Sequence, residues 1–172
     1  STEKLGDPLH PFEAFTASVC NLRPESRGHI RIKSPDASEA PLIQPDYLSA
    51  PEDRKVAADA IKLTRKIVSA PAMEKYQPQE YKPGIEFSSD EELAREAGNI
   101  GTTIFHPVGT CKMGPETDSH AVVDDRLRLH SISGIRVVDA SVMPTITSGN
   151  TNSPTLMIAE KASEMIREDW KG

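Results

Sequence analysis

His106 is the side chain in this sequence that is best placed to handle a proton. It stands in FHPVGTCKMG, between Phe105 and Pro107, at the start of a short apolar run. We expect the imidazole to be largely desolvated there, with its backbone held by the proline. A desolvated imidazole stays neutral near pH 7, and the neutral form is the one that accepts a proton. The commoner alternative is a core histidine whose ring nitrogens are satisfied by neighbouring groups.

Polar residues near the C-terminus could complete such a site. Asn150 and Asn152 lie in SGNTNSP, directly before a predicted helix. Such residues usually act as caps, but helix-start N–H groups also attract electron-rich ligand atoms. An asparagine side chain can hold a substrate hydroxyl without taking its proton. Asp139 and Ala140 follow an apolar stretch, and strand ends in α/β sheets face the ligand crevice; a plain turn or cap is the alternative for this pair.

Other chemistries lack their usual signals. No histidine pairs with another histidine, a cysteine or a carboxylate at a metal-ligand spacing, whether His10, His29, His106, His120 or His130. The patterns G-x-S-x-G, G-x-G-x-x-G and G-x-x-x-x-G-K-[ST] are also absent. We therefore expect no metal site, no serine-hydrolase elbow and no phosphate-cradling fingerprint.

Composition narrows the class of protein further. The 172 residues are 37% apolar and 27% charged, and the net charge of -6 argues against a nucleic-acid partner. No stretch approaches the ~20 apolar residues of a membrane span, and the first eight residues do not resemble a signal peptide. We expect a cytoplasmic protein, with membrane association of a full-length protein left open. Cys20 and Cys111 are expected to be reduced, buried thiols, a disulfide being the alternative.

The elements that position these residues begin with strands. Residues 1–11 predict an irregular arm. The run 12–22, FEAFTASVCNL, favours a strand that forms a hairpin with 29–33, HIRIK, across a broad loop. Three prolines make 34–48 an extended loop with at most short edge pairing.

Two helices are predicted in the middle of the chain. The first runs to about Ser69, with Ser49 as its cap and Glu52 in the capping-box position. Its predicted apolar face comprises Val56, Ala60, Leu63 and Ile67. Pro71 ends it, and a short turn over 72–76 follows.

The second predicted helix leads the chain toward His106. Ser89 and Glu92 predict a capping box at its start. The helix is expected to run to about Ala97, with Gly98 or Gly101 stopping it.

The remainder predicts short strands and a final helix. Three short strands are expected at 122–123, 127–129 and 135–138, the last of them buried on both faces. The final helix begins near Ser153 and Pro154. Its predicted apolar face comprises Leu156, Ile158, Ala159, Ala162, Met165 and Ile166. The order of elements predicts an α+β fold that resembles pieces of two layers.

Three segments together resemble one family. HPVGTCKMG, VVDDRLRLHSISGIRVVDASVMP and TSGNTNSPTLMIAEKASEMI are similar, in order and spacing, to the C-terminal domain of the glucose–methanol–choline (GMC) oxidoreductases. The resemblance covers about Phe12 to Ile166. It implies an antiparallel-sheet substrate-binding domain in 1–121 and, in 122–172, the C-terminal strands and helix of an FAD-binding α/β domain. The N-terminal FAD-binding region, with its G-x-G-x-x-G fingerprint, is then expected to lie outside this sequence.

The same resemblance implies roles for the candidate residues. His106 matches the catalytic histidine, which takes the alcohol proton or stabilises the alkoxide as hydride leaves for flavin N5. Asn150 matches the second catalytic position, which hydrogen-bonds the substrate oxygen. Asp139 and Ala140 match positions that approach the FAD ribityl and pyrophosphate groups, and Asn152 matches a position at the isoalloxazine ring.

The function implied is FAD-dependent oxidation of a primary alcohol, choline-like or other, to an aldehyde. The partners implied are the alcohol and the missing FAD-binding region, and this chain alone is not expected to bind FAD with useful affinity. The choice among choline, aliphatic and aromatic alcohols stays open, as does the electron acceptor. The alternative is a non-catalytic binding or structural module that retains the scaffold. A metal-dependent hydrolase that uses His106 is disfavoured, because the sequence offers no further metal ligands at a suitable spacing from this histidine.

Overall fold

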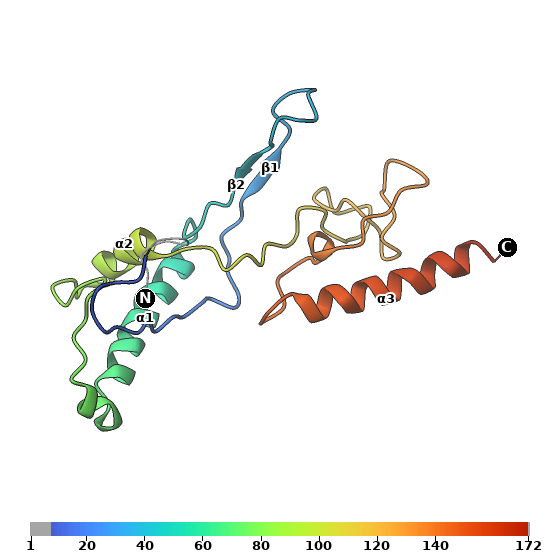
Figure 1. Cartoon of the computed structure of the whole chain (residues 1–172). Coiled ribbons are helices and arrows are strands. Elements are labelled where there is room, and N and C mark those ends of the chain that lie inside the picture. Colours follow the sequence, from blue (N-terminus) through green and yellow to red (C-terminus); the bar gives the residue numbers. More distant parts are fainter. Residues whose placement is uncertain (1–7, 172) are drawn as a thin grey trace. The chain divides into compact units, whose positions relative to one another are not determined.

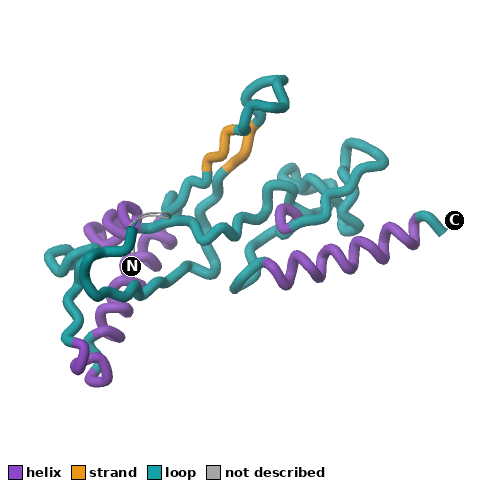
Figure 2. The backbone as a smooth tube through the Cα atoms, in the orientation of Figure 1, coloured by secondary structure: helices purple, strands orange, loops and turns teal. Residues whose placement is uncertain are grey.

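The computed structural model of the chain describes residues 8–171. Helices and one antiparallel strand pair occur together, as an α+β composition requires. In chain order the described elements are β1 (His29–Arg31), β2 (Leu42–Gln44), α1 (Pro51–Val68), η1 (Pro71–Tyr76), α2 (Asp90–Ile100), η2 (Ala140–Val142) and α3 (Asn152–Asp169), where η marks a 3₁₀ helix (Figure 1). Loops connect them over long stretches, most of all between α2 and α3 (Figure 2). The first seven residues of the predicted N-terminal arm lie outside the described residues.

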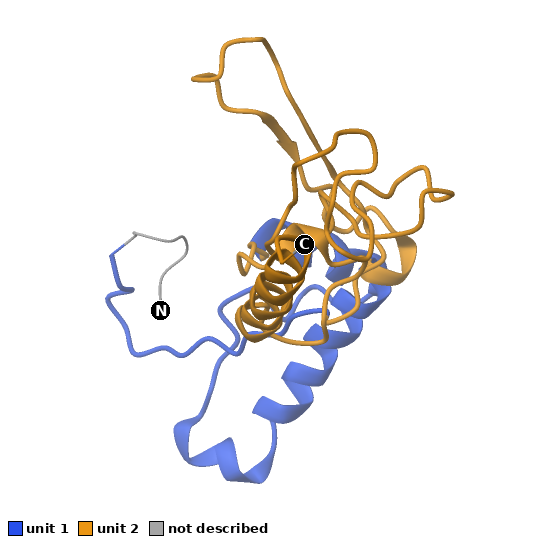
Figure 3. Ribbon diagram, turned by 90° about the vertical axis from the view of Figure 1, so that its right-hand side faces the viewer, with its two compact units in different colours: residues 1–21, 54–100 blue, residues 22–53, 101–172 orange. Residues whose placement is uncertain are grey.

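The chain divides into two compact units (Figure 3). One comprises Ser1–Asn21 and Arg54–Ile100, and the other comprises Leu22–Asp53 and Gly101–Gly172. Every candidate site residue belongs to the second unit, so the site can be described within one body. The predicted domain boundary between residues 121 and 122 stays a prediction.

The strand pair lies in the second unit. β1 pairs antiparallel with β2, with Ile30 opposite Ile43 at the centre of the register. The predicted strand at 29–33 is therefore confirmed over three residues, and its partner is the stretch expected to give at most short edge pairing. A Cβ atom at Gly28 would lie 2.1 Å from the Gln44 carbonyl oxygen. Glycine at this position therefore allows the two backbones to approach closely.

The predicted strand over 12–22 is wrong. None of these residues belongs to a strand, and nearly all are exposed. The large apolar side chains recur every three or four positions rather than every second one, so they could not line one face of a strand. Cys20 is a free thiol, as expected, but it is exposed rather than buried; Cys111 is free and half-buried.

The first long helix, α1, confirms the predicted span from about Ser49 to Ser69. Its predicted apolar face is only partly right, because Leu63 and Ile67 are exposed whereas Ala58 is fully buried. Asp53 in its first turn is also buried, and its carboxylate accepts hydrogen bonds from the backbone N–H groups of Glu25 (2.9 Å) and Ser26 (2.7 Å). This carboxylate fixes the chain that leads into β1.

The capping box predicted for the second helix is present. The Ser89 hydroxyl accepts from the Glu92 backbone N–H at 3.3 Å, and the Glu92 carboxylate accepts from the Ser89 N–H at 3.1 Å. The side-chain hydrogen bond from Ser89, followed by backbone N–H donors of Ser89 and Ser88, lowers the pKa of Glu92. α2 continues through Gly98 and ends before Gly101, the second of the two predicted stops. The short turn expected after Pro71 is the 3₁₀ helix η1.

The prediction of three short strands between residues 122 and 138 is wrong. The structure has single bridges instead, which join Met113 to Val123, Val123 to Leu129, and Arg128 to Arg136. The stretch expected to be buried on both faces is only half-buried at Val137 and Val138. A strand needs pairing at consecutive residues, whereas each of these bridges is isolated.

The hydrophobic core of the second unit lies beneath α3. Val123, Leu127, Val142 and Ala162 form this cluster, and partly buried residues pack around it. α3 begins at Asn152, one residue before the predicted cap. Part of its predicted apolar face is exposed, including Leu156 and Ile166. Over residues 8–171, no helix is long and apolar enough to cross a membrane.

Candidate active site

The segment that carries His106 is fixed by backbone hydrogen bonds to the end of η2. The N–H of Cys111 donates to the Ser141 carbonyl (3.0 Å), and the N–H of Met113 donates to the Val142 carbonyl (2.9 Å). Val142 and Met143 are buried, so the segment rests on the core. Gly109 has a φ of +87°, a left-handed conformation that suits glycine and lets the chain turn before this anchor.

The residue before the histidine also has a left-handed backbone. Phe105 has a φ of 60°, which is uncommon for a bulky residue. Its N–H donates to the Thr103 hydroxyl at 3.1 Å, which supports the turn. The Phe105 side chain points into solvent and does not cover the histidine. His106 is half-buried, so the expected desolvation of its ring is met only in part.

The ring of His106 bridges to the start of α3. Nδ1 lies 2.9 Å from the hydroxyl oxygen of Thr151. Nε2 lies 3.0 Å from the side-chain nitrogen of Asn150. The two sequence segments predicted to face each other therefore meet through both ring nitrogens. Such an arrangement orients the imidazole and leaves Nε2 on the exposed side, beside an amide.

Asn150 belongs to an exposed loop with one further anchor. The guanidinium Nε of Arg23 donates to the hydroxyl of Ser148 at 3.0 Å, across 125 positions in the sequence. This contact ties the loop before α3 to the chain that leads into β1. The amide of Asn150 therefore lies between two fixed points, Ser148 on one side and the helix start on the other.

The three other predicted site residues lie apart from the histidine. Asp139 is exposed and precedes η2, where one carboxylate oxygen accepts from the backbone N–H of Ser141 (2.8 Å) and from its hydroxyl. Ala140 is the half-buried first residue of η2, and Asn152 is the exposed first residue of α3. Within residues 8–171 no hydrogen bond joins Asp139 or Asn152 to His106. η2 and α3 are in contact, so these residues lie on neighbouring elements.

Sequence reasoning missed Thr151. Its hydroxyl contacts the ring of His106, and it is one of two buried polar or charged residues among those described, the other being Asp53. The only available signal was its position between two candidate asparagines. A threonine before a helix has the ordinary appearance of a cap, so that signal was weak.

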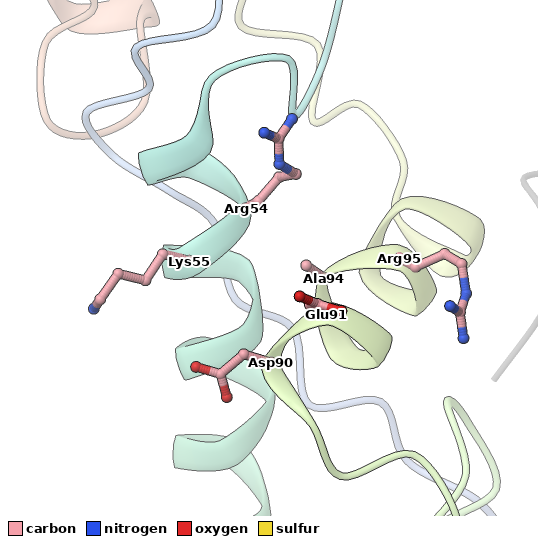
Figure 4. Close-up of a pocket in the computed structure, with 6 residues that line it drawn as sticks. All are labelled: Arg54, Lys55, Asp90, Glu91, Ala94 and Arg95. Atoms are coloured by element: carbon pink, nitrogen blue, oxygen red, sulfur yellow. The ribbon is translucent and has the colours of Figure 1, made fainter.

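No group of three or more potential metal ligands gathers in the part of the chain that the structure describes. A hollow of ≈ 420 Å³ lies in the first unit, between α1 and α2 (Figure 4). It is lined by Arg54, Lys55, Asp90, Glu91, Ala94 and Arg95 and contains no predicted site residue.

Comparison with known protein families gives one match over most of the chain. The sequence model described as GMC oxidoreductase, for the C-terminal domain, matches residues 24–159. An alcohol dehydrogenase [acceptor] from Pseudomonas putida is 47% identical over 152 residues, which is 88% of this chain and 27% of that protein. An oxygen-dependent choline dehydrogenase from Cronobacter sakazakii is 46% identical over 153 residues, or 89% of this chain and 27% of that protein.

Solved structures show the same similarity. Pyridoxine 4-oxidase from Mesorbium loti matches with a TM-score of 0.79 and 34% identity, covering 86% of this chain and 28% of that one. An FAD-dependent oxidoreductase from Chaetomium thermophilum matches with a TM-score of 0.80 and 29% identity, covering 86% of this chain and 26% of that one. The chain thus spans about a quarter of the length of the proteins it matches.

Proposed function

Because the chain belongs to the GMC oxidoreductases and corresponds to their C-terminal domain, we propose that it forms the catalytic, substrate-facing part of an FAD-dependent enzyme. The reaction proposed is oxidation of a primary alcohol to an aldehyde. The observation that carries the proposal is the contact of His106 Nε2 with the Asn150 amide. An imidazole beside an amide donor supplies a proton acceptor and a group that binds oxygen, which is what removal of an alcohol proton requires.

In this proposal His106 takes the hydroxyl proton of the alcohol at Nε2. This nitrogen is on the exposed side of a half-buried ring, so an alcohol can approach it from solvent. Proton transfer by a positioned side chain contributes typically about 100- to 10,000-fold to a rate. The contact of Nδ1 with Thr151 keeps the ring from rotating away during that transfer.

Asn150 binds the substrate oxygen in the same proposal. Without substrate, the side-chain nitrogen of Asn150 lies 3.0 Å from Nε2 of His106. An alcohol oxygen within hydrogen-bond reach of both groups replaces this direct contact. The amide then donates to the oxygen as negative charge develops there, and it cannot compete for the proton because it is not a base.

FAD, when bound, accepts the hydride that leaves the alcohol carbon. Asp139, Ala140 and Asn152 are the residues of this chain that would face it. Asp139 fits this role, because the hydrogen bonds from Ser141 go to one carboxylate oxygen and the other has no partner among the described residues. The start of α3 also fits, because no side chain caps it and its first N–H groups remain available to electron-rich atoms.

The proposal includes a domain assignment. Residues 1–121 then belong to a substrate-binding domain. Residues 122–172 form the C-terminal part of an FAD-binding domain. The surface of α3 supports the second assignment. Leu156 and Met157 are each 60% exposed. Large apolar side chains exposed on a helix are found on surfaces that another part of a protein covers.

The reaction class is tested by anaerobic reduction of the flavin in the FAD-loaded enzyme that contains this chain. The alcohols include choline and simple aliphatic and aromatic primary alcohols. We expect at least one to bleach the flavin and to give one aldehyde per flavin reduced. A stably FAD-loaded enzyme whose flavin no alcohol reduces would contradict the proposal and favour a module that has kept only the scaffold.

A further inference from the structure

Thr151 connects the two halves of the candidate site. It follows Asn150 directly in the sequence, and its hydroxyl oxygen lies 2.9 Å from Nδ1 of His106. Only 8% of its surface is exposed, so water competes little for this hydrogen bond. A hydrogen bond shielded in this way can fix the orientation of the His106 ring more firmly than the exposed contact between Nε2 and Asn150.

The start of α3 leaves this hydroxyl free for the ring. A threonine at the N-cap normally accepts from the N–H of the second or third helical residue. Thr151 has a helical backbone, with φ −90° and ψ −4°, and makes no such bond. The third helical residue is Pro154, which has no N–H to donate. The hydroxyl is therefore used on His106 rather than on the helix.

The contact with Asn150 selects one tautomer of the His106 ring. The side-chain nitrogen of Asn150 is a donor only, so Nε2 of His106 accepts from it at 3.0 Å. In a neutral imidazole the other nitrogen then carries the hydrogen. Nδ1–H accordingly donates to the hydroxyl oxygen of Thr151. Asn150 thus places the lone pair on Nε2, and Thr151 holds the ring from its other nitrogen.

We propose that Thr151 is a positioning residue that accepts from Nδ1–H of His106 and so holds the ring with its Nε2 lone pair toward Asn150 and the alcohol. This inference rests on the proposed function, in which His106 accepts the alcohol proton. When Nε2 takes that proton, the ring becomes an imidazolium and Nδ1–H continues to donate to Thr151. The ring therefore keeps one orientation before and after the transfer, which is the value of a preorganised site.

The test is ¹⁵N NMR of His106 in the full 172-residue chain, at a pH where the ring is neutral. We expect wild type to show a protonated Nδ1 and an unprotonated Nε2. Thr151→Val keeps the branched shape without the hydroxyl, and should speed the exchange of the Nδ1–H hydrogen with water by about fivefold, the effect of losing one ordinary hydrogen bond. Thr151→Ser keeps the hydroxyl and should restore the wild-type exchange rate.

Thr64→Val is the matched control, because the Thr64 hydroxyl donates only within α1, to the Ala60 carbonyl at 2.9 Å. An unchanged exchange rate in Thr151→Val, or a wild-type ring protonated mainly at Nε2, would overturn the inference. If Thr151→Val does not fold, the protonated nitrogen of the wild-type ring still tests it. Because the experiment uses neither flavin nor alcohol, it fails separately from the proposed function. Alcohol oxidation together with an unchanged exchange rate in Thr151→Val would overturn only the role of Thr151.

Discussion

The side-chain nitrogen of Asn150 lies 3.0 Å from Nε2 of His106, although 44 positions separate the two residues in the sequence. The contact depends on two anchors: the backbone of the histidine segment bonds to the end of η2, and the asparagine lies two residues before the start of α3. η2 and α3 are themselves in contact. The pair is therefore held by the fold of one unit and not by a single flexible loop.

Asn150→Ala is expected to slow alcohol oxidation in the FAD-loaded enzyme. Loss of one donor to a developing oxyanion costs about 100-fold in the chemical step. The measurement is the rate of flavin reduction at saturating alcohol by stopped flow. Asn99→Ala is the control, because Asn99 bonds only to Glu96 within α2 and belongs to the other unit. Equal rates in the two variants would remove Asn150 from the reaction.

The isolated chain is expected not to retain FAD. The groups proposed to face the cofactor are one carboxylate and one helix start, and the sequence contains no G-x-G-x-x-G fingerprint to bind the pyrophosphate. The measurement is visible flavin absorbance after the purified chain is mixed with FAD and desalted. Retention of one FAD per chain would show that the described residues form a sufficient cofactor site.

Asp53→Ala is expected to destabilise the chain strongly. The buried carboxylate accepts from the N–H groups of Glu25 and Ser26, and its removal leaves both donors without that acceptor. Hydrogen bonds to charged groups contribute about 1.5–3 kcal/mol each, so we expect a loss of about 3 kcal/mol in the free energy of unfolding by urea. Asp53→Asn should lose less, because the amide oxygen still accepts one bond.

Asp59→Asn is the matched control for this substitution. Asp59 is an exposed residue of the same helix and is paired with Lys55 across one turn. Such surface pairs contribute at most about 1 kcal/mol. If Asp53→Ala and Asp59→Asn were equally stable, the buried carboxylate would have no special role in fixing the chain before β1.

Asp169→Asn is expected to change how stability depends on pH. The hydrogen bond from Arg136, with the charges of Arg126 and Arg128, lowers the pKa of Asp169 below its usual value of 3.8. A carboxyl whose folded pKa is depressed stabilises the protein above its unfolded pKa, and this stabilisation is lost as the pH falls through the folded value. Wild type should exceed the variant in stability near neutral pH, and the difference should shrink below pH 3.8.

The measurement is the urea midpoint of both proteins between neutral and acidic pH. Glu164→Gln is the control, since Glu164 is paired only with the exposed Lys161 one turn away. A difference between wild type and Asp169→Asn that did not change on acidification would contradict the role given to the arginine cluster.

The helices could be predicted from the sequence because their signals are local. The capping box of Ser89 and Glu92 lies within four residues, and α1 begins and ends within about two residues of prediction. Strands could not be predicted in the same way, because pairing joins distant residues. Among residues 8–171, the stretch 12–22 has no partner strand, and 135–138 has a single bridge, at Arg136.

The candidate site could likewise be predicted only in part. The family resemblance led to His106 and Asn150, and the structure brings them within hydrogen-bond distance. The contact with Thr151 depends on how the turn before α3 directs one hydroxyl, and residue types alone do not encode that direction. The desolvation of His106 is only partial, and Phe105, which turns outward on a left-handed backbone, does not add to it.

The central claim is that His106 is the proton acceptor for alcohol oxidation, and anaerobic flavin reduction in His106→Ala tests it most directly. With FAD content equal to wild type, we expect the rate at saturating alcohol to fall by about 100- to 10,000-fold. His120→Ala, which alters an exposed histidine of the same unit, should reduce its flavin at the wild-type rate. A wild-type rate in His106→Ala would contradict the account.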